Sequence, residues 1–390
     1  MRRVATVAAM CLLASAASAK VYFHESFDDG ADKWVQSESK ADYGKLAATS
    51  GDFFGDAQIN KGLKTTQDAK FYAFSVALPE AVSNEGKNLV VSLSVKHEQG
   101  LDCGGGYIKV MPEMDQKKFN GDSEYYLMFG PDQCGYNKKV HVIFGYNGKN
   151  LLWKKEPRYP DDKLTHVYTL VVTPENTYEF YIDKEKKESG SLEADWAFLE
   201  PKEIDDVTDK KPSDWIDDAM MDDAEDKKPE DWDAEAEKIV DPDAKQPEDW
   251  DEEEDGKWEA PMVPNPKFKG EWRAKRIPNP AYKGAWKPKQ VANPAYKEDD
   301  KLYMTRKPLS VVGIDVWQVK SGSVFDNIII GDNLDEVFEI VDKTWGATKD
   351  AEKAALDAQD KKDAPAEAPQ AEEDAKEDGE ADEETDKEDL

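Results

Sequence analysis

The sequence predicts a mainly β protein in which a single β-sandwich is interrupted by a long proline-rich arm. Short segments rich in β-branched and aromatic residues fill residues 20–200 and resume at 309–330. Between them, residues 201–300 instead repeat two units that contain Trp and Pro. Many short strands without intervening helical patterns are typical of a two-sheet sandwich. Regular repeats indicate a separate structural element.

The strands of the sandwich are predicted from the alternation of apolar and polar side chains. Residues 89–95 alternate almost strictly, which places every second side chain on one apolar face. Comparable segments follow at 107–110, 140–144, 167–172 and 178–182. The apolar segments at 309–317 and 325–330 need partners, and the strands before the arm are the available ones. We therefore expect a discontinuous sandwich made of residues 20–200 and 301–348.

The arm, residues 201–300, contains three copies of each repeat. The unit Lys-Pro-x-Asp-Trp, once with Gln in place of Lys, ends at Trp215, Trp232 and Trp250. A second unit runs from Gly-x-Trp to Asn-Pro and contains Trp258, Trp272 and Trp286. Dense Pro excludes a continuous helix or central sheet strands. This order predicts a hairpin that pairs the first unit with the last through Trp side chains. A disordered acidic linker, the alternative, gives no reason for regularly spaced Trp.

Both ends of the chain carry signals of their own. Arg2 and Arg3 precede an apolar run that ends in Ala17-Ser18-Ala19, so residues 1–19 are predicted to be a signal peptide. No later segment is apolar over the roughly 20 residues that a membrane span needs. Residues 349–390 are predicted to form a C-terminal helix and an acidic tail. Residues 350–390 contain 18 acidic and 5 basic side chains, a net charge of −13.

Net charge and cysteine content limit the kinds of ligand and chemistry that we expect. The 390 residues carry a net charge of −32, which attracts cations and repels nucleic acid and anionic membranes. Cys103 and Cys134 remain after removal of the signal peptide, and an oxidising lumen favours a disulfide between them. A catalytic thiol is the alternative, but neither Cys lies in a nucleophile signature.

Five further motifs occur in the sandwich segments: residues 96–99 (Lys-His-Glu-Gln), 102–107 (Asp-Cys-Gly-Gly-Gly-Tyr), 121–125 (Gly-Asp-Ser-Glu-Tyr), 128–132 (Met-Phe-Gly-Pro-Asp) and 317–322 (Trp-Gln-Val-Lys-Ser-Gly). Together with the arm repeats, they resemble the calreticulin/calnexin family of endoplasmic reticulum lectin chaperones over nearly all of residues 20–350. The resemblance implies a jelly-roll (concanavalin-like) lectin domain and no enzymatic activity. It implies binding of monoglucosylated high-mannose glycans on newly made glycoproteins, and of unfolded polypeptide, by a monomer in the endoplasmic reticulum lumen.

The resemblance also implies three sets of functional residues. The carbohydrate-binding set is Tyr107, Lys109, Tyr125, Met128, Asp132, Asp315 and Trp317. Sugars need hydrogen-bonding groups for their hydroxyls and aromatic or sulfur-bearing side chains for their C–H faces. The calcium set is Ser26, Ile59 and Lys61 through carbonyl oxygens and Asp326 through its carboxylate, all hard oxygen ligands. The arm tip, with Glu253, Asp255 and Trp258, is expected to recruit a thioredoxin-like protein disulfide isomerase.

Two signals concern the tail. Its carboxylates are expected to bind calcium weakly at many sites, which would contribute to calcium storage. The final Lys387-Glu388-Asp389-Leu390 resembles a retention signal with its middle residues exchanged.

Two other functions remain as alternatives. Sandwich glycosidases need paired carboxylates, but the nearest pattern, residues 203–208, has Thr208 in place of the second acid and lies at the start of the arm. A calcium-storage protein with little lectin activity explains the charge but neither the Trp repeats nor the Tyr/Lys/Asp set.

Overall fold

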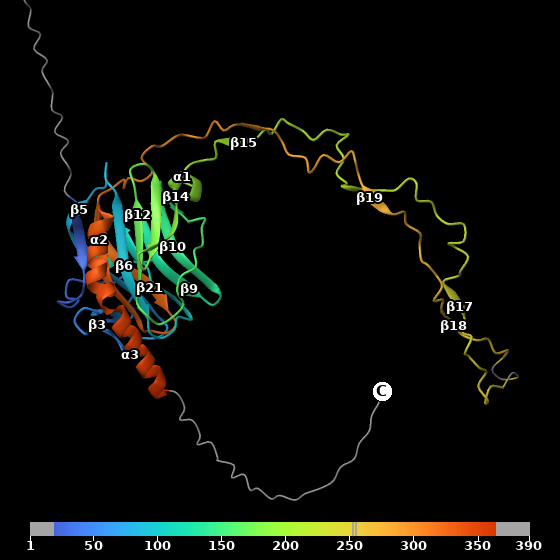
Figure 1. Cartoon of the computed structure of the whole chain (residues 1–390), viewed down its shortest axis with the longest axis horizontal. Helices are drawn as coiled ribbons and strands as arrows, with labels where there is room; N and C mark the ends of the chain where they lie inside the picture. The colour runs from blue at the N-terminus through green and yellow to red at the C-terminus, as the bar shows by residue number, and fades with distance from the viewer. Residues whose placement is uncertain (1–18, 252, 254–255, 364–390) are drawn as a thin grey trace, which may run out of the picture. The chain divides into compact units, whose positions relative to one another are not determined.

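The computed structural model describes residues 19–251, 253 and 256–363. The chain divides into two compact units, Met1–Glu200 together with Lys297–Leu390, and Pro201–Tyr296. The first unit contains two β-sheets and the C-terminal helices, and the second is the arm (Figure 1). The mainly β sandwich predicted from the sequence is confirmed. The signal peptide through residue 18 and the tail beyond residue 363, including the retention-like ending, lie outside the described residues.

Sheet 1 has the strand order β14-β13-β12-β6-β22-β4-β3, and β1 also pairs with β22. Its strands are β1 (Val21–Glu25), β3 (Leu46–Thr49), β4 (Gly62–Thr65), β6 (Leu89–His97), β12 (His166–Val172), β13 (Thr177–Ile182), β14 (Glu185–Ser191) and β22 (Ser323–Gly331). Strand β22 follows the arm in sequence, yet it is paired antiparallel with both β6 and β4. The chain after the arm therefore completes a sheet that was begun before it.

Sheet 2 has the order β11-β10-β9-β7-β21-β5-β2, and β8 pairs with both β21 and β9. Its strands are β2 (Val35–Gln36), β5 (Lys70–Val82), β7 (Cys103–Gly105), β8 (Ile108–Met111), β9 (Leu127–Cys134), β10 (Asn137–Tyr146), β11 (Lys149–Leu151) and β21 (Leu309–Gln318). A short 3-10 helix, Gln116–Lys118, follows β8. The other post-arm strand, β21, is also internal to its sheet: it pairs with β5 on one side and with β7 and β8 on the other.

The main hydrophobic core lies between the two sheets. Leu93 and Phe325 of sheet 1 and Phe129 and Ile314 of sheet 2 are completely buried in it. Because side chains alternate along a strand, every second residue of these strands enters this core and the others face outward. Each fully buried large apolar side chain stabilises the fold by about 1.5–3 kcal/mol. The outward side chains of sheet 2 are consequently available for a site.

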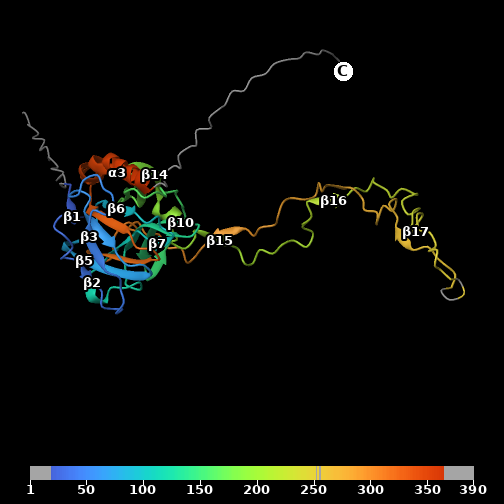
Figure 2. The ribbon, with the colours of Figure 1, turned by 90° about the horizontal axis from the view of Figure 1, so that it is seen from below.

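Helices cover the outer face of sheet 1 (Figures 1 and 2). They are α2 (Leu334–Val341), a π-helical turn (Asp342–Gly346) and α3 (Ala347–Asp363), while the short α1 (Leu192–Asp195) follows β14. Asn333 caps α2 by accepting a hydrogen bond from the Glu336 amide at 3.1 Å. The predicted C-terminal helix is confirmed as α3, but helical chain already begins at Leu334, because Val337 and Val341 bury an apolar stripe against sheet 1.

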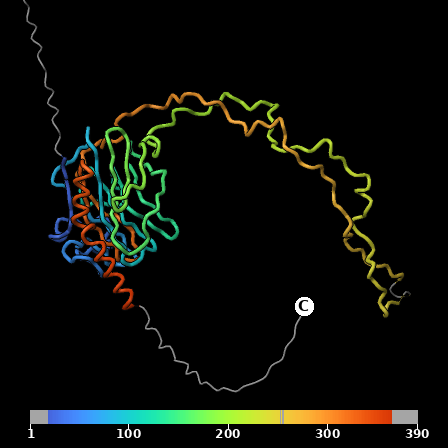
Figure 3. Tube along the Cα trace, viewed as in Figure 1, coloured from blue at the N-terminus to red at the C-terminus, as the bar shows by residue number. Residues whose placement is uncertain are grey.

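The arm is a hairpin with three short antiparallel rungs (Figure 3). They pair β15 (Glu203–Asp205) with β20 (Gln290–Ala292), β16 (Met220–Asp222) with β19 (Arg276–Pro278), and β17 (Lys238–Val240) with β18 (Met262–Pro264). The first repeat thus pairs with the last, as predicted. The indole N–H groups of Trp215, Trp232 and Trp250 donate across the hairpin to the carbonyl oxygens of Gly284, Gly270 and Gly256.

Hydrogen bonds, more than buried apolar area, hold the arm together. Asn265 is the only buried residue among the described residues of 201–296. It and the equivalent Asn279 and Asn293 of the other repeats donate side-chain hydrogen bonds to carbonyl oxygens of the opposite leg. The Trp and Asn residues of the repeats therefore hold the two legs together by hydrogen bonds, without a hydrophobic core.

Candidate functional site

The outer face of sheet 2 carries the predicted carbohydrate-binding residues, and five of them lie on its strands. On β8, Ile108 and Val110 enter the core, so Lys109 between them faces outward. The same alternation turns Met128 and Asp132 of β9 outward, and Asp315 and Trp317 of β21. Lys109 pairs in register with Met128 on one side and with Gly313 on the other. The site therefore depends on pairing between strands that precede and follow the arm.

A buried ion pair forms the centre of this face. Lys109 Nζ lies 2.7 Å from Asp315 Oδ2 and 3.0 Å from the carbonyl oxygen of Gly121, to which it donates. Only 1% of the Lys109 side chain and 12% of the Asp315 side chain are exposed. The ammonium also lies 5.4 Å from the centre of the Tyr125 ring, within the range of a cation–π contact. Lys109 is thus fully partnered, and the Asp315 carboxylate lies nearer the surface.

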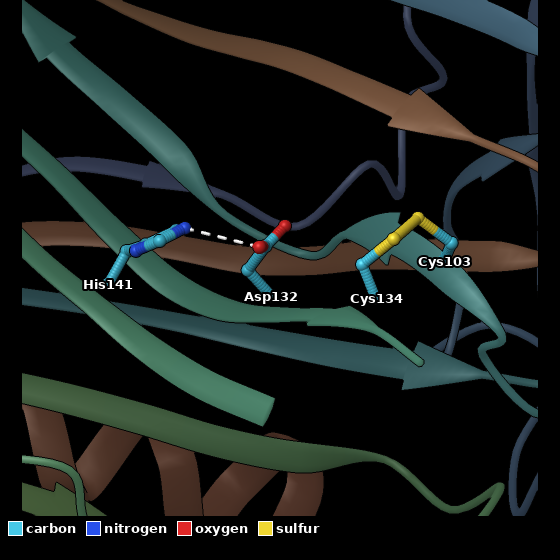
Figure 4. The surroundings of a disulfide bond; sticks show 4 residues. All are labelled: Cys103, Asp132, Cys134 and His141. Atoms are coloured by element: carbon cyan, nitrogen blue, oxygen red, sulfur yellow. Dashed lines mark ion pairs between the residues drawn. A yellow bond between two sulfur atoms is a disulfide. The ribbon is translucent and has the colours of Figure 1, made fainter. Parts of the chain in front are cut away.

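Tyr107, Asp132 and His141 form a second polar group on this face. The Tyr107 and His141 rings meet edge to face with centroids 5.5 Å apart, and His141 Nε2 lies 3.3 Å from Asp132 Oδ2 (Figure 4). Burial raises the pKa of the Tyr107 hydroxyl, and the negative charges of Asp315 and Asp132 raise it further. The hydroxyl, protonated at neutral pH in any tyrosine, therefore stays protonated to a still higher pH and can donate a hydrogen bond.

The disulfide between Cys103 and Cys134 is confirmed (Figure 4). The two residues are direct register partners of β7 and β9, with Cα atoms 3.9 Å apart. It covalently joins the strand that leads to Tyr107 with the strand that carries Asp132. The disulfide therefore fixes the relative position of two parts of the site.

Apolar surfaces border the polar groups. Tyr125 belongs to a small hydrophobic cluster on the outer face of sheet 2, and Met128 packs against that cluster. The Trp317 ring lies 4.6 Å from that of Phe71 at an interplanar angle of 53°. Phe71 and His141 are absent from the predicted set. They lie on β5 and β10, and no local sequence signal reveals that these strands neighbour the others.

A groove of about 390 Å³ adjoins the ion pair. It is lined by residues 121–125, residues 145–150 and Arg306, so Gly121 and Tyr125 are shared with the ion-pair region. Its volume is within the range of small-molecule sites. The combined surface offers hydroxyl partners, aromatic faces and a recess beside them.

The residues predicted to bind calcium surround the start of β22. Ser26 directly follows β1, which pairs with β22 at Glu25 and Ile328. Lys61 precedes β4, which pairs with β22 at Leu63 and Phe325. A Cβ atom at Gly62 would come within 2.6 Å of the Phe325 carbonyl oxygen, so this glycine permits a close approach of the two strands. Three separate segments thus converge near Asp326.

The chemistry of Asp326 fits a cation. Its side chain accepts hydrogen bonds from the Asn327 backbone amide at 2.6 Å and the Asn327 side-chain amide at 2.7 Å. Burial raises the pKa of Asp326 well above its usual range despite these bonds, and the charges of Asp28 and Glu25 add to the rise. Within the described ranges, no group of three or more His, Cys, Asp or Glu could hold a metal ion. A cation here would need carbonyl ligands, which are what the predicted set contains.

Two of the three predicted tip residues can be placed. Glu253 is exposed and Trp258 is partly buried, on either side of Gly256, while Asp255 lies outside the described residues. Gly256 has φ +79°, a left-handed conformation that suits a turn at the end of the hairpin. The tip is therefore a turn with an indole beside it.

The fold and these surfaces define a class: a concanavalin-like β-sandwich with an inserted hairpin arm. The calreticulin family model matches residues 23–256 and 253–330, and the chain belongs to the calreticulin family. Within the parts of the chain that the structure describes, no helix is long and apolar enough to span a bilayer. Membership gives the chain the general role of this family, that of lectin chaperones.

Several relatives support this assignment. The chain is 58% identical to calreticulin of Euglena gracilis over 350 residues, covering 90% of this chain and 87% of the relative. Mouse calreticulin is 55% identical over 353 residues, covering 89% and 84%. Among solved structures, the globular domain of T. cruzi calreticulin matches with a TM-score of 0.65 and 40% identity, covering 88% of this chain and all of that domain.

Proposed function

We propose that this protein binds monoglucosylated high-mannose glycans on newly made glycoproteins through the outer face of sheet 2. The observation that carries the proposal is the Lys109–Asp315 ion pair, 2.7 Å long and bordered by Tyr125 and Met128. A carboxylate held in place by a buried ammonium can accept hydrogen bonds from adjacent sugar hydroxyls, and the neighbouring aromatic ring can pack against the C–H face between them.

Each residue has a distinct role in this proposal. Asp315 accepts from sugar hydroxyls, and Lys109 holds its carboxylate in place. The Tyr107 hydroxyl, which like any tyrosine is protonated at neutral pH, donates. Asp132, oriented by His141, supplies a second acceptor. Met128 and Trp317 provide apolar contact, and the adjoining groove accommodates further sugar units of the same glycan.

Calcium has two roles in the proposed function. The family is one of calcium-binding proteins, and we assign one structural ion to Ser26, Ile59, Lys61 and Asp326. In support, the Asp326 carboxylate is buried with the negative charges of Asp28 and Glu25 around it. When bound, calcium would neutralise this charge and tie three segments of sheet 1 together. The acidic tail would add weak sites and contribute to calcium storage.

The arm tip is proposed to recruit a thioredoxin-like protein disulfide isomerase. Glu253, Asp255 and Trp258 would provide acidic groups and an apolar anchor for a basic partner surface. Binding of unfolded polypeptide completes the chaperone role. Relatives in this family are endoplasmic reticulum proteins, and we place this chain in the same lumen on the basis of residues 1–19 and its C-terminal residues.

The test is calorimetric binding of a monoglucosylated and an unglucosylated high-mannose glycan, with and without calcium. We expect binding that requires the terminal glucose. Equal affinity for both glycans would contradict the proposed specificity. Calcium binding without measurable glycan binding would instead favour the alternative, a calcium-storage protein with little lectin activity, which the net charge of −32 also accommodates.

A further inference from the structure

The motif at residues 96–99 lies at the end of β6, and its side chains point alternately to the two faces of sheet 1. Lys96 and Glu98 form an ion pair with a separation of 2.8 Å, and Lys96 also lies 3.4 Å from Glu352 of α3 on the outer face of sheet 1. His97 and Gln99 alternate with them and point toward sheet 2. Their hydrogen bonds go to Ser323, Gln318 and the Lys320 carbonyl oxygen. The proposed sugar and calcium sites therefore do not account for His97 and Gln99.

His97 and Gln99 belong to a polar hub, which we define as His97, Gln99, Gln318 and Ser323; Gln318 and Ser323 are completely buried, and His97 and Gln99 are partly buried. Ser323 Oγ is its centre: it accepts from Gln99 Nε2 at 2.9 Å, donates to Gln318 Oε1 at 3.2 Å and lies 2.8 Å from His97 Nδ1. His97 Nε2 is buried without a hydrogen-bond partner, and the Ser323 hydroxyl has a second acceptor in Gln318, so we assign the neutral tautomer in which His97 donates from Nδ1. Burial lowers the pKa of His97 to about 4, which keeps the ring neutral.

The hub connects sheet 1 to the loop that carries Tyr107. Gln318, which is completely buried, donates from Nε2 to the carbonyl oxygen of Gly105 at 2.7 Å. A continuous chain of hydrogen bonds thus runs from β6 through Ser323 and Gln318 to a backbone atom two residues before Tyr107. On the other side of the same loop, the Gly106 amide donates to Pro131 at 2.7 Å.

Three glycines allow the loop to lie directly on the hub. A Cβ atom at Gly104 would lie 2.9 Å from Gln318 Oε1, and one at Gly106 would lie 2.8 Å from the His97 ring. A Cβ atom at Gly105 would collide with the Tyr107 ring itself. The loop therefore has no space in which to shift toward the hub, and Tyr107 packs over the glycine whose carbonyl the hub holds.

We propose that His97, Gln318 and Ser323 are positioning residues that hold the Gly104–Gly106 loop, and with it Tyr107, in the geometry that binds sugar. The inference rests on the proposed glycan binding by Tyr107. The hub adds to the disulfide and to the pairing of Gly104 and Gly105 with β9, because neither of those contacts connects this segment to sheet 1.

The first test compares Gln318→Met with Ser92→Ala. The Met side chain has a similar length but cannot bond Gly105 or Ser323. Ser92 of the same β6 strand forms a buried hydrogen bond of 2.8 Å with Thr169, away from the loop, so it is a matched control for lost polar contacts. Both variants should lower the melting temperature. Only Gln318→Met should weaken binding of the monoglucosylated glycan, by about tenfold, and accelerate hydrogen exchange of the Gly106 amide.

A second pair of variants tests the His97 tautomer. In His97→Asn, the side-chain amide lies near the position of Nδ1 and can replace its N–H donor. In His97→Gln, the amide lies near the position of Nε2 and cannot reach Ser323 in the same way. His97→Asn should therefore retain glycan affinity and His97→Gln should lose it.

The outcomes separate the two proposals. Unchanged glycan affinity and exchange in Gln318→Met would overturn the positioning role while leaving the sugar site intact, and so would equal affinities of the two His97 variants. If the parent protein itself fails to bind the glycan, glycan binding is wrong, and exchange of the Gly106 amide still reports whether the hub holds the loop. If Gln318→Met fails to fold, the comparison of His97→Asn with His97→Gln tests the positioning role.

Discussion

Lys109 and Asp315 are 206 residues apart in the chain, yet their charged groups meet at 2.7 Å on the outer face of sheet 2. One precedes the arm and the other follows it. Their contact is possible because β8 and β21 are paired, with Lys109 opposite Gly313. The Lys109 ammonium is buried, so Asp315 is its counterion as well as a candidate sugar ligand.

Replacing Asp315 with Ala should abolish glycan binding and also destabilise the fold. Removing one partner of a buried ion pair leaves the other charge without compensation, at a cost of about 3–5 kcal/mol. Asp315→Asn keeps an oxygen acceptor and should cost less. Calorimetry with the glycan and urea denaturation measure the two effects.

The control for this change is Asp42→Ala, which removes an exposed ion pair of 3.7 Å with Lys70 on the same sheet. Exposed pairs contribute little, so the stability should change by less than about 1 kcal/mol and glycan affinity should be unchanged. Parent-like glycan affinity in Asp315→Ala would show that the binding site lies elsewhere.

Removing calcium should lower the melting temperature of the parent protein, because an ion that binds only the folded state stabilises it by mass action. At a calcium concentration 100 times the dissociation constant, the gain is about 2.7 kcal/mol. In Asp326→Asn, the difference between calcium and chelator should be smaller by this amount, as followed by calorimetric melting. The comparison with this variant cancels effects of calcium on the many other carboxylates. A calcium effect of equal size in both proteins would remove Asp326 from the ligand set.

Changes at the arm tip should alter isomerase binding without affecting glycan binding. Trp258→Ala removes a partly buried indole and should weaken binding more than the loss of any single charge. Lys257→Glu makes the tip more acidic and should speed association with a basic partner, an effect that weakens as salt shortens the Debye length below about 8 Å. Binding kinetics against the isomerase measure both.

The matched control is Trp272→Ala, at the equivalent position of the next repeat, where the indole is also partly buried. It should leave isomerase affinity unchanged. The tip proposal is wrong if Trp258→Ala binds the isomerase as well as the parent does.

His97 should make the protein less stable in acid. Burial, together with the charge of His166, lowers the pKa of His97 to about 4 in the folded protein, against an ordinary value of 6.5. Between about pH 6.5 and pH 4, the His97 ring binds a proton in the unfolded chain but not in the folded protein. Stability from this group is therefore present above pH 6.5 and is lost as the pH falls toward about 4, by about 3 kcal/mol in total. His97→Asn should remove this loss in urea denaturation at several pH values.

His166 provides a control of opposite sign. Burial lowers the pKa of His166, but hydrogen bonds to Asp183 and Asp162 outweigh it, and the net shift is upward. Its contribution to stability is fully present below pH 6.5 and lost as the pH rises through the folded pKa. His166→Asn should therefore destabilise the protein mainly in acid. If both His variants had the same dependence on pH, the assignment for His97 would be refuted.

Glu352→Ala should release α3 from sheet 1. The Glu352 carboxylate is buried, accepts from the Thr165 hydroxyl at 2.7 Å and lies 3.4 Å from Lys96 Nζ. Lys96 keeps Glu98 as a partner in this variant, so the free energy of unfolding should fall by only about 1–3 kcal/mol. Hydrogen exchange along α3 should be faster. Lys353→Ala, which affects only an exposed contact of 4.0 Å with Asp357, should change stability by less than about 0.5 kcal/mol. Unaltered exchange in Glu352→Ala would mean that this contact does not hold the helix.

Strands with strict alternation could be predicted from the sequence, and strands without it could not. Residues 89–95, 140–144, 167–172 and 178–182 all lie within observed strands, because their period of two reflects burial of one face. Strand β5 was not predicted, although it is 13 residues long. Both faces of its central part are covered, so polar and apolar residues do not alternate there. Helix α2 was missed for a related reason, since its apolar stripe at Val337 and Val341 is only two turns long.

The residues of the candidate site were identified by resemblance, whereas their neighbours were not. Phe71 against Trp317 and His141 against Asp132 depend on which strands are adjacent, a property that no segment of the sequence carries locally. The hub is a similar case: Gln318 lies in a predicted motif, but its bond to Gly105 connects residues 213 apart.

By itself, the sequence determined the sandwich, the hairpin arm, the pairing of first repeat with last and the disulfide between Cys103 and Cys134. These features follow from local periodicity, from repeat order and from the number of available cysteines. Only the tertiary structure decided that Lys109 is buried against Asp315, that α3 is held by a buried carboxylate, and that His97 underlies the Tyr107 loop. Such contacts join residues far apart in sequence, and they form only when strand order and register bring them together, because the free energy that fixes the register is spread over the whole core.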